Sequence, residues 1–288
     1  MVTILGRAKI NLTLDILGLR DDGYHEIATV MQSLALADTL TLTRQEEGIT
    51  LTVDLPGLEA DERNLAHRAA ALIMNECGVR NGVHIAITKR IPVAAGLAGG
   101  SADAAAALRG MNELYELGLS DECLCDLGAK LGSDIPFSLM GGTVLATGRG
   151  EALQSLTDFP QTFVVLAKPP VEVSTPWAYR SYDAHPPEYH PDNAAFIEAL
   201  ARGDRESCAQ LISNVLEPVT EAVHPVIGDY RVRMLTHGAI CAMMSGSGPT
   251  VFGLFADERT AADAAEAFRR ETDAAVYLTR TAGRYGQQ

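Results

Sequence analysis

The sequence predicts an α+β protein built from two domains. Its 288 residues, 47% of them apolar, suffice for one large domain or two modest ones, at roughly 100 to 200 residues per domain. In the first half, strand patterns surround a loop of small residues that leads into an alanine-rich helix. The second half has the order strand, helices, two strands, helix and strand, which suits a split β-α-β sandwich. We therefore expect domains over residues 1–150 and 151–288.

The first half opens with strands and one helix. Residues 8–16 alternate apolar and polar side chains, as a half-buried strand does. Further alternation at 39–43 and 49–55, on either side of a charged turn, predicts a hairpin. Helical spacing over 64–77 predicts a helix, and Gly78 is its stop signal.

A strand, a loop and a helix follow. The strand is expected over 83–91, the loop from Pro92 to Ser101 and the helix from about Ala102 to Leu117. A second helix should begin after a Ser120 cap, run to Leu131 and break at a rigid turn over 132–136. The other expected elements are strands at 141–147, 162–167, 239–244, 250–255 and 275–279, a proline-rich stretch at 169–191, helices ending near 235, and a helix over 258–271.

Composition and charge exclude several classes of protein. The 23 Lys and Arg against 37 Asp and Glu give a net charge of −14, which disfavours a broad nucleic-acid surface. Glycines and Pro249 interrupt the longest uncharged run, residues 237–256, so no membrane helix is expected there. The first 16 residues have no uninterrupted apolar core, so we expect a cytoplasmic protein without a secretory signal.

The five cysteines predict reduced thiols. They are an odd number scattered over a long chain, at positions 77, 123, 125, 208 and 241, which argues against a disulfide framework. Cys123 and Cys125 are two apart on an expected helix, where they point in different directions and suit one metal ion poorly.

The small-residue loop is a candidate phosphate site. Glycine and alanine let backbone N–H groups approach an anion, and the helix that opens at Ser101 adds the positive end of its dipole. The same residues also suit tight packing of a strand against a helix. The GxGxxG motif is absent, so the sequence does not support a dinucleotide-dependent oxidoreductase. The Walker and protein-kinase motifs are absent as well.

Lys9 and Asp134 are the candidate catalytic residues. Lys9 shares the polar face of its strand with Asn11, and Asp134 lies in the turn between Gly132 and Pro136. From the pattern alone, a solvated strand lysine and a capping aspartate are the favoured interpretations. Beside a phosphate loop, however, a carboxylate that accepts a proton and an ammonium that stabilises negative charge suit phosphoryl transfer to a hydroxyl.

A polar turn offers a way to hold a nucleobase. Arg20–His25 ends in Tyr24 and His25, which provide a stacking face and a selective hydrogen bond. Trp177 or Tyr179 can supply the opposing aromatic ring. The alternatives are a surface turn and aromatic residues that only pack.

Three segments, in this order, resemble motifs of the small-molecule kinases that include galactokinase, homoserine kinase, mevalonate kinase and phosphomevalonate kinase (GHMP kinases). They are Ala8–Asn11, Pro92–Ala102 with its helix, and Met244–Phe252. The resemblance runs from about residue 6 to 255 and is weakest over 182–213. The loop is richer in glycine in these relatives, where this chain has Ala94, Ala95 and Ala98.

Four segments are similar to one branch of that family. The branch phosphorylates the 2-hydroxyl of a cytidyl-diphosphate methylerythritol in the non-mevalonate isoprenoid pathway, with ATP and Mg²⁺. The segments are Ala8–Leu12, Arg20–His25, Gly132–Phe137 and Gly148–Glu151. The resemblance implies that Asp134 is the general base and that Lys9 stabilises the transferred charge.

The resemblance also implies the binding residues. For ATP they are Asn64, Lys89, Pro92, Val93, Ala94, Ala95, Gly96, Leu97, Ala98, Gly99, Gly100, Ser101 and Ala102. For the substrate they are Asn11, Tyr24, His25, Thr175, Tyr179, Gly246 and Gly248. The metal ligands stay unknown; Ser101 is the one candidate, and no carboxylate cluster accompanies it.

The family fold would be an N-terminal domain like domain 2 of ribosomal protein S5 and a C-terminal ferredoxin-like domain, with both substrates in the cleft between them. The expected partners are ATP and a small molecule, without nucleic acid or membrane, and the chain can be a monomer or a weak homodimer. Two alternatives remain, namely a kinase of mevalonate, homoserine or a sugar, and a non-catalytic binding module of the same fold.

Overall fold

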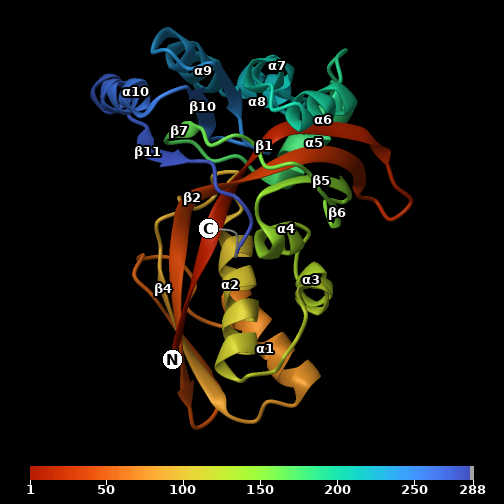
Figure 1. Ribbon diagram of the computed structural model, residues 1–288, viewed down its shortest axis with the longest axis vertical. Helices are drawn as coiled ribbons and strands as arrows, with labels where there is room; N and C mark the ends of the chain where they lie inside the picture. The colour runs from red at the N-terminus through yellow and green to blue at the C-terminus, as the bar shows by residue number, and fades with distance from the viewer. Residues whose placement is uncertain (286–288) are drawn as a thin grey trace. The chain divides into compact units, whose positions relative to one another are not determined.

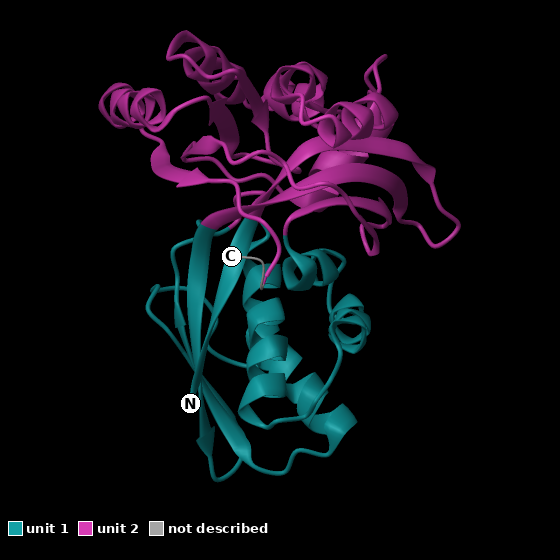
Figure 2. Ribbon diagram, in the orientation of Figure 1, with its two compact units in different colours: residues 1–8, 36–93, 98–141 teal, residues 9–35, 94–97, 142–288 magenta. Residues whose placement is uncertain are grey.

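The computed structural model describes residues 1–285, which form two compact units (Figure 2). Unit 1 contains residues 1–8, 36–93 and 98–141, and unit 2 contains 9–35, 94–97 and the chain from 142 onward. Strands β1 (Val2–Leu19) and β2 (His25–Gln45) contribute to both units, so these units do not follow a single cut after residue 150. The boundary of the functional domains at that residue stays a prediction.

Unit 1 contains a mixed sheet. The prediction of a hairpin within it is wrong. Both of its segments are strands, but β4 (Gly82–Thr88) lies between β2 and β3 (Ile49–Val53). β4 is antiparallel to β2 and parallel to β3. The reason is the helix between β3 and β4, which returns the chain as a crossover and so makes the two strands parallel.

Two helices, α1 (Leu65–Cys77) and α2 (Gly99–Leu114), pack against each other in unit 1 (Figure 1). The α1 prediction is confirmed, since the Asn64 side chain caps its start and Gly78 ends it with φ 65°. Alanines on both helices join leucines and isoleucines of the strands in one core, because small side chains allow close packing. That core includes Leu40, Leu42, Ile73, Ile85, Ala69, Ala104, Ala107 and Leu108.

The structure corrects two predicted boundaries. Helix α2 begins at Gly99 rather than about Ala102, after Ala98 with φ 57°, so Ser101 is already helical. α3 (Asp121–Ala129) begins after the Ser120 cap as predicted. The expected rigid turn over 132–136, however, is partly the start of α4 (Asp134–Met140). Proline is tolerated in a first helical turn, where its missing N–H removes no hydrogen bond, so Pro136 does not break α4.

Unit 2 contains the antiparallel sheet expected of a ferredoxin-like domain. Its strands are β7 (Phe163–Lys168), β9 (Cys241–Met244), β10 (Val251–Phe255) and β11 (Ala275–Arg280), in the order β11-β7-β10-β9. All neighbouring pairs are antiparallel. Helices α9 (Val226–Thr236) and α10 (Glu258–Glu271) pack on this sheet (Figure 1). The predicted split β-α-β sandwich is confirmed.

The remaining elements of unit 2 are shorter. They are β5 (Thr143–Gly148), β6 (Ala152–Ser155), β8 (Ser213–Asn214), α5 (Thr175–Ala184), α6 (Asn193–Ala201), α7 (Arg205–Leu211) and α8 (Glu217–Val223). β5 pairs with β2, and β8 pairs in parallel with β1. In the described part of the chain, no helix combines the length and the hydropathy that a bilayer crossing requires. The five cysteines, all within that part, are free thiols.

Candidate active site

The ammonium group of Lys9 is held by fixed acceptors. Lys9 Nζ donates to Asn11 Oδ1 at 2.7 Å and to the carbonyl of Gly96 at 3.2 Å. Asn11 Nδ2 in turn donates to Thr29 Oγ1 at 2.8 Å. Both side chains are buried, so Lys9 is not a solvated strand lysine. The polar face of β1 thus carries a preorganised cation of the kind that binds an anion.

The middle of the small-residue loop, residues 94–97, lies beside this lysine in unit 2. The backbone N–H of Lys9 donates to Leu97 O at 3.2 Å, and Ser245 Oγ donates to Gly96 O at 3.0 Å. Gly96 has φ 72°, and a Cβ atom there would lie 2.2 Å from Ser245 O. Only glycine fits this position, because any side chain would collide with the Ser245 backbone.

The turn between β9 and β10 completes this part of the site. A Cβ atom at Gly246 would lie 3.4 Å from Lys9 Nζ and 3.3 Å from Asn11 Oδ1. Gly248 N donates to Ser245 O at 3.0 Å, which closes the turn. Residues 9–11, 94–97 and 245–248, which are parts of three motifs separated in the sequence, therefore meet around the Lys9 ammonium within unit 2.

Two buried polar residues that the sequence analysis missed hold this turn. Asn214 Nδ2 donates to Met244 O and Gly246 O, and Glu217 Oε2 accepts from Met244 N at 2.7 Å. Burial raises the pKa of Glu217, against the opposing effects of that backbone N–H and of Arg231. The two residues flank the apolar pair Val215 and Leu216, which is a weak signal because polar residues beside apolar ones are common in loops.

The residues predicted to bind a base form two aromatic contacts. His25 Nε2 lies 2.8 Å from Asp183 Oδ1, and the His25 ring lies 4.9 Å from the Tyr179 ring between centroids. Tyr24 is 58% exposed, and the guanidinium of Arg149 lies 5.1 Å from its ring centroid. A base-binding surface needs such an accessible ring beside a fixed hydrogen-bonding group.

The contacts of Trp177 and Tyr179 show which of these two candidate aromatic residues lies beside His25. Trp177 packs edge-on against His224, with centroids 6.2 Å apart, so Tyr179 is the one beside His25. Thr175, the first residue of α5, places its Oγ1 2.9 Å from Ser247 Oγ in the β9–β10 turn. Arg149 and Asp183 were not predicted as site residues. Arg149 lies in the Gly148–Glu151 segment that resembles the family, whereas Asp183 had no signal in the sequence.

In unit 1, the start of α2 presents free backbone amides. Gly99, Gly100 and Ser101 form its first turn, and Ala102 is the first whose N–H bonds back, to Ala98 O at 2.9 Å. Such a turn favours anions through its amides and the helix dipole. Asn64, also predicted to bind ATP, caps α1, where its Oδ1 accepts from Ala66 N at 2.9 Å.

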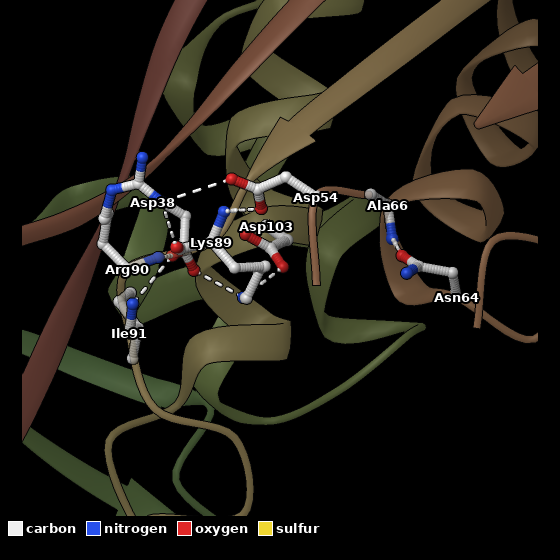
Figure 3. Close-up of polar contacts among 8 residues, drawn as sticks. All are labelled: Asp38, Asp54, Asn64, Ala66, Lys89, Arg90, Ile91 and Asp103. Carbon is white, nitrogen blue, oxygen red and sulfur yellow. Dashed lines mark hydrogen bonds and ion pairs between the residues drawn. The ribbon is translucent and has the colours of Figure 1, made fainter. Parts of the chain in front are cut away.

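Lys89 lies in a buried group of charges (Figure 3). Its Nζ donates to Asp38 Oδ2 at 2.5 Å and to Asp103 Oδ2 at 2.7 Å, and all three side chains are at most 5% exposed. Burial alone would lower the pKa of Lys89, but the two carboxylates outweigh burial and raise that pKa. Burial raises the pKa of Asp103 to about 7, with Lys89 opposing the rise and Asp38 adding to it. Contact of Lys89 with a nucleotide stays a prediction.

Asp134 is the first residue of α4 in unit 1 and is partly exposed. Its carbonyl accepts from Ser138 Oγ at 3.0 Å. Because Lys9 belongs to unit 2, the pairing of Lys9 with Asp134 stays a prediction. Across residues 1–285, no three His, Cys, Asp or Glu side chains form a group suited to a metal ion.

Comparison with known families identifies the class of protein as a kinase of small molecules. A family model described as GHMP kinases N terminal domain matches residues 64–142, and one described as GHMP kinases C terminal matches residues 196–274. The chain belongs to the GHMP kinase family and is an ATP-dependent enzyme.

Several similar proteins carry the name of one branch of the family. A 4-diphosphocytidyl-2-C-methyl-D-erythritol kinase from Pelotomaculum thermopropionicum is 47% identical over 282 residues, 98% of each chain. A protein of the same name from Synechococcus sp. (strain JA-3-3Ab) is 50% identical over 91% of this chain and 87% of its own. A crystal structure of a 4-(cytidine 5'-diphospho)-2C-methyl-D-erythritol kinase has a TM-score of 0.85 at 35% identity and covers 98% of this chain and 100% of its own.

Proposed function

We propose that this enzyme transfers the γ-phosphoryl group of ATP to the 2-hydroxyl of 4-diphosphocytidyl-2-C-methyl-D-erythritol, in the non-mevalonate route to isoprenoids. The observation that carries the proposal is the near full-length similarity, 47% over 98% of each chain, to a kinase named for that substrate. The paired His25 and Tyr179 and the exposed Tyr24 support it, because mevalonate, homoserine and sugars contain no base.

The chemistry follows from two groups. The hydroxyl oxygen attacks the γ-phosphorus, a new P–O bond forms, and the bond to the β–γ bridging oxygen breaks so that ADP leaves with the electron pair. We assign the hydroxyl proton to the Asp134 carboxylate as general base. Lys9 stabilises the negative charge of the transferred group, and its bonds to Asn11 and Gly96 support this role by fixing the ammonium.

The loop from Pro92 to Ala102 is proposed to bind the ATP phosphates. The free amides of Gly99, Gly100 and Ser101 support this assignment. We propose that Mg²⁺ enters with ATP and is held mainly by phosphate oxygens, since a magnesium ion commonly keeps water and takes only one or two protein ligands. A cytoplasmic location, proposed here as well, agrees with the five free thiols.

The test is turnover by the purified protein with MgATP and each of four acceptors. We expect ADP release with the cytidyl compound and none with mevalonate, homoserine or galactose. Turnover with another of these alcohols would retain the kinase and reject the role of Tyr24 and His25. No turnover with any acceptor would favour a binding module of the same fold.

A further inference from the structure

The strand that enters the phosphate loop is fixed by one buried carboxylate. Asp38 Oδ1 accepts the backbone N–H groups of Arg90, at 2.5 Å, and Ile91, at 2.8 Å. Its other oxygen accepts from Lys89 Nζ (Figure 3). Asp38 is completely buried on β2, so the three residues before Pro92 are bound to the sheet.

The helix that leaves the loop is fixed by the same ammonium. Asp103 lies on the second turn of α2, and its Oδ2 accepts from Lys89 Nζ at 2.7 Å. A Cβ atom at Gly99 would lie 3.6 Å from that Nζ. Lys89 thus lies under the first turn of α2 and joins the strand before the loop to the helix after it, all within unit 1.

This buried group of three charges contributes little net stability, because each charge loses its hydration. Two carboxylates share one ammonium, and Asp103 Oδ1 is a buried atom without a hydrogen-bond partner among the described residues. Apolar residues of similar volume commonly replace buried ion pairs without loss of stability. The directional bonds, in contrast, set where the first turn of α2 lies relative to the end of β4.

We propose that Asp38, Lys89 and Asp103 are positioning residues that hold the free amides of Gly99–Ser101 where they bind nucleotide phosphates. The inference deepens the proposed function, on which it rests. In this proposed role the three residues act through the backbone rather than by contact with a phosphate, which for Lys89 differs from the direct nucleotide contact that the family resemblance implies. A displacement of about 1 Å at such a site costs binding and rate although every ligand-contacting group remains.

The test removes the ion pair between Lys89 and Asp103. The double variant Lys89→Met/Asp103→Asn lacks both charged groups of that pair and leaves Asp38 with its two backbone donors. Asp54→Asn is the matched control, because Asp54 accepts from Lys89 N at 2.7 Å and from the Arg90 guanidinium but lies on the exposed side of the strand. The measurements are the Kd for ADP by calorimetry, and kcat with the KM of each substrate.

For the double variant we expect a Kd for ADP and a KM for ATP at least about tenfold higher, and a KM for the second substrate within about twofold of wild type. The control should stay within about twofold throughout. If the ion pair between Lys89 and Asp103 only supported folding, the amount of active enzyme would fall while both KM values and the Kd stayed unchanged. That result contradicts the inference.

Failure of the inference differs from failure of the proposed function. A wild type that binds ADP, with a double variant that binds it equally well, rejects the positioning role alone. A wild type that binds ADP but does not phosphorylate the cytidyl compound rejects the proposed substrate, and the Kd values still decide the positioning role. A wild type that binds no ADP rejects both.

Discussion

The side chain of Asn214 donates to two carbonyl groups of the turn between β9 and β10, Met244 O at 2.9 Å and Gly246 O at 2.8 Å. Its Oδ1 accepts from Leu216 N at 2.9 Å, so the buried amide uses all but one of its hydrogen-bonding positions. The turn is fixed from β8 in this way. Since Gly246 lies against Lys9, Asn214 also sets where the turn meets the lysine.

Asn214→Leu should lower the free energy of unfolding by about 1–3 kcal/mol, because two buried carbonyls lose their donor. Denaturation in urea, followed by circular dichroism, measures the change. Asn81→Leu, at an exposed position, should change stability by less than about 0.5 kcal/mol. Equal effects of the two substitutions would show that the Asn214 bonds contribute nothing specific.

Asp134→Asn should lower kcat by about 10²-fold or more and leave the Kd for ADP within about twofold, because the amide cannot accept the hydroxyl proton. Asp126→Asn, which removes an exposed carboxylate from the neighbouring helix α3, is the control and should retain full activity. Steady-state kinetics and calorimetry separate the two effects. A variant at position 134 that turns over at the wild-type rate would exclude Asp134 as base.

His25→Ala should raise the KM for the cytidyl substrate about tenfold or more without a change in the KM for ATP, since the imidazole is proposed to bond only the base. Asp183→Asn should have a smaller effect of the same kind, because Asp183 only orients the ring through its bond to Nε2. Both KM values come from initial rates at varied substrate. An equal rise for the two substrates would place His25 elsewhere.

Ala98→Gly should raise the free energy of unfolding by up to about 1 kcal/mol. Ala98 has φ 57°, a left-handed conformation that costs a residue with a Cβ atom roughly 1–2 kcal/mol, of which the greater freedom of glycine in the unfolded chain offsets a part. Ala102→Gly, inside α2, should have the opposite sign. Thermal unfolding of both variants checks this; destabilisation by both would mean that the loop conformation is unstrained.

The stability that Asp103 contributes should fall as pH rises. Burial raises its folded-state pKa to about 7, whereas an unfolded aspartate titrates near pH 4, so the folded protein binds the additional proton between those values. This contribution is complete below about pH 4 and is lost as pH rises through 7. The difference in free energy of unfolding, wild type minus Asp103→Asn, should therefore decrease from pH 5 to pH 8.

Urea denaturation at several pH values measures that difference. Asp54→Asn is the control, because the backbone N–H of Lys89 and the Arg90 guanidinium lower the pKa of Asp54 below its ordinary value. Asp54 thus stays ionised over the whole range, and its difference curve should be flat. A flat curve for Asp103→Asn as well would mean that Lys89 keeps Asp103 ionised.

Local patterns in the sequence predicted most of the elements. Helix α10 matches its expected bounds, Glu258–Glu271, because an acid-capped amphipathic helix carries its start, stop and buried face within one stretch. The ferredoxin-like order in unit 2 also followed from the succession of strand and helix patterns. The prediction of a β2–β3 hairpin was wrong, because the crossover through α1 places β4 between the two strands. The turn between the two segments does not determine that pairing.

The residue types of the candidate site could also be predicted from local sequence, since small residues, a lysine and an aspartate suit phosphate chemistry wherever they lie. Which neighbours hold them became visible in the fold alone. Asn214, Glu217 and Asp183 reach the site from distant segments, and the partners of Lys89 lie 51 and 14 residues away along the chain. Most buried polar groups are paired wherever the fold puts them, and this pairing joins distant parts of the sequence in ways that no local period encodes.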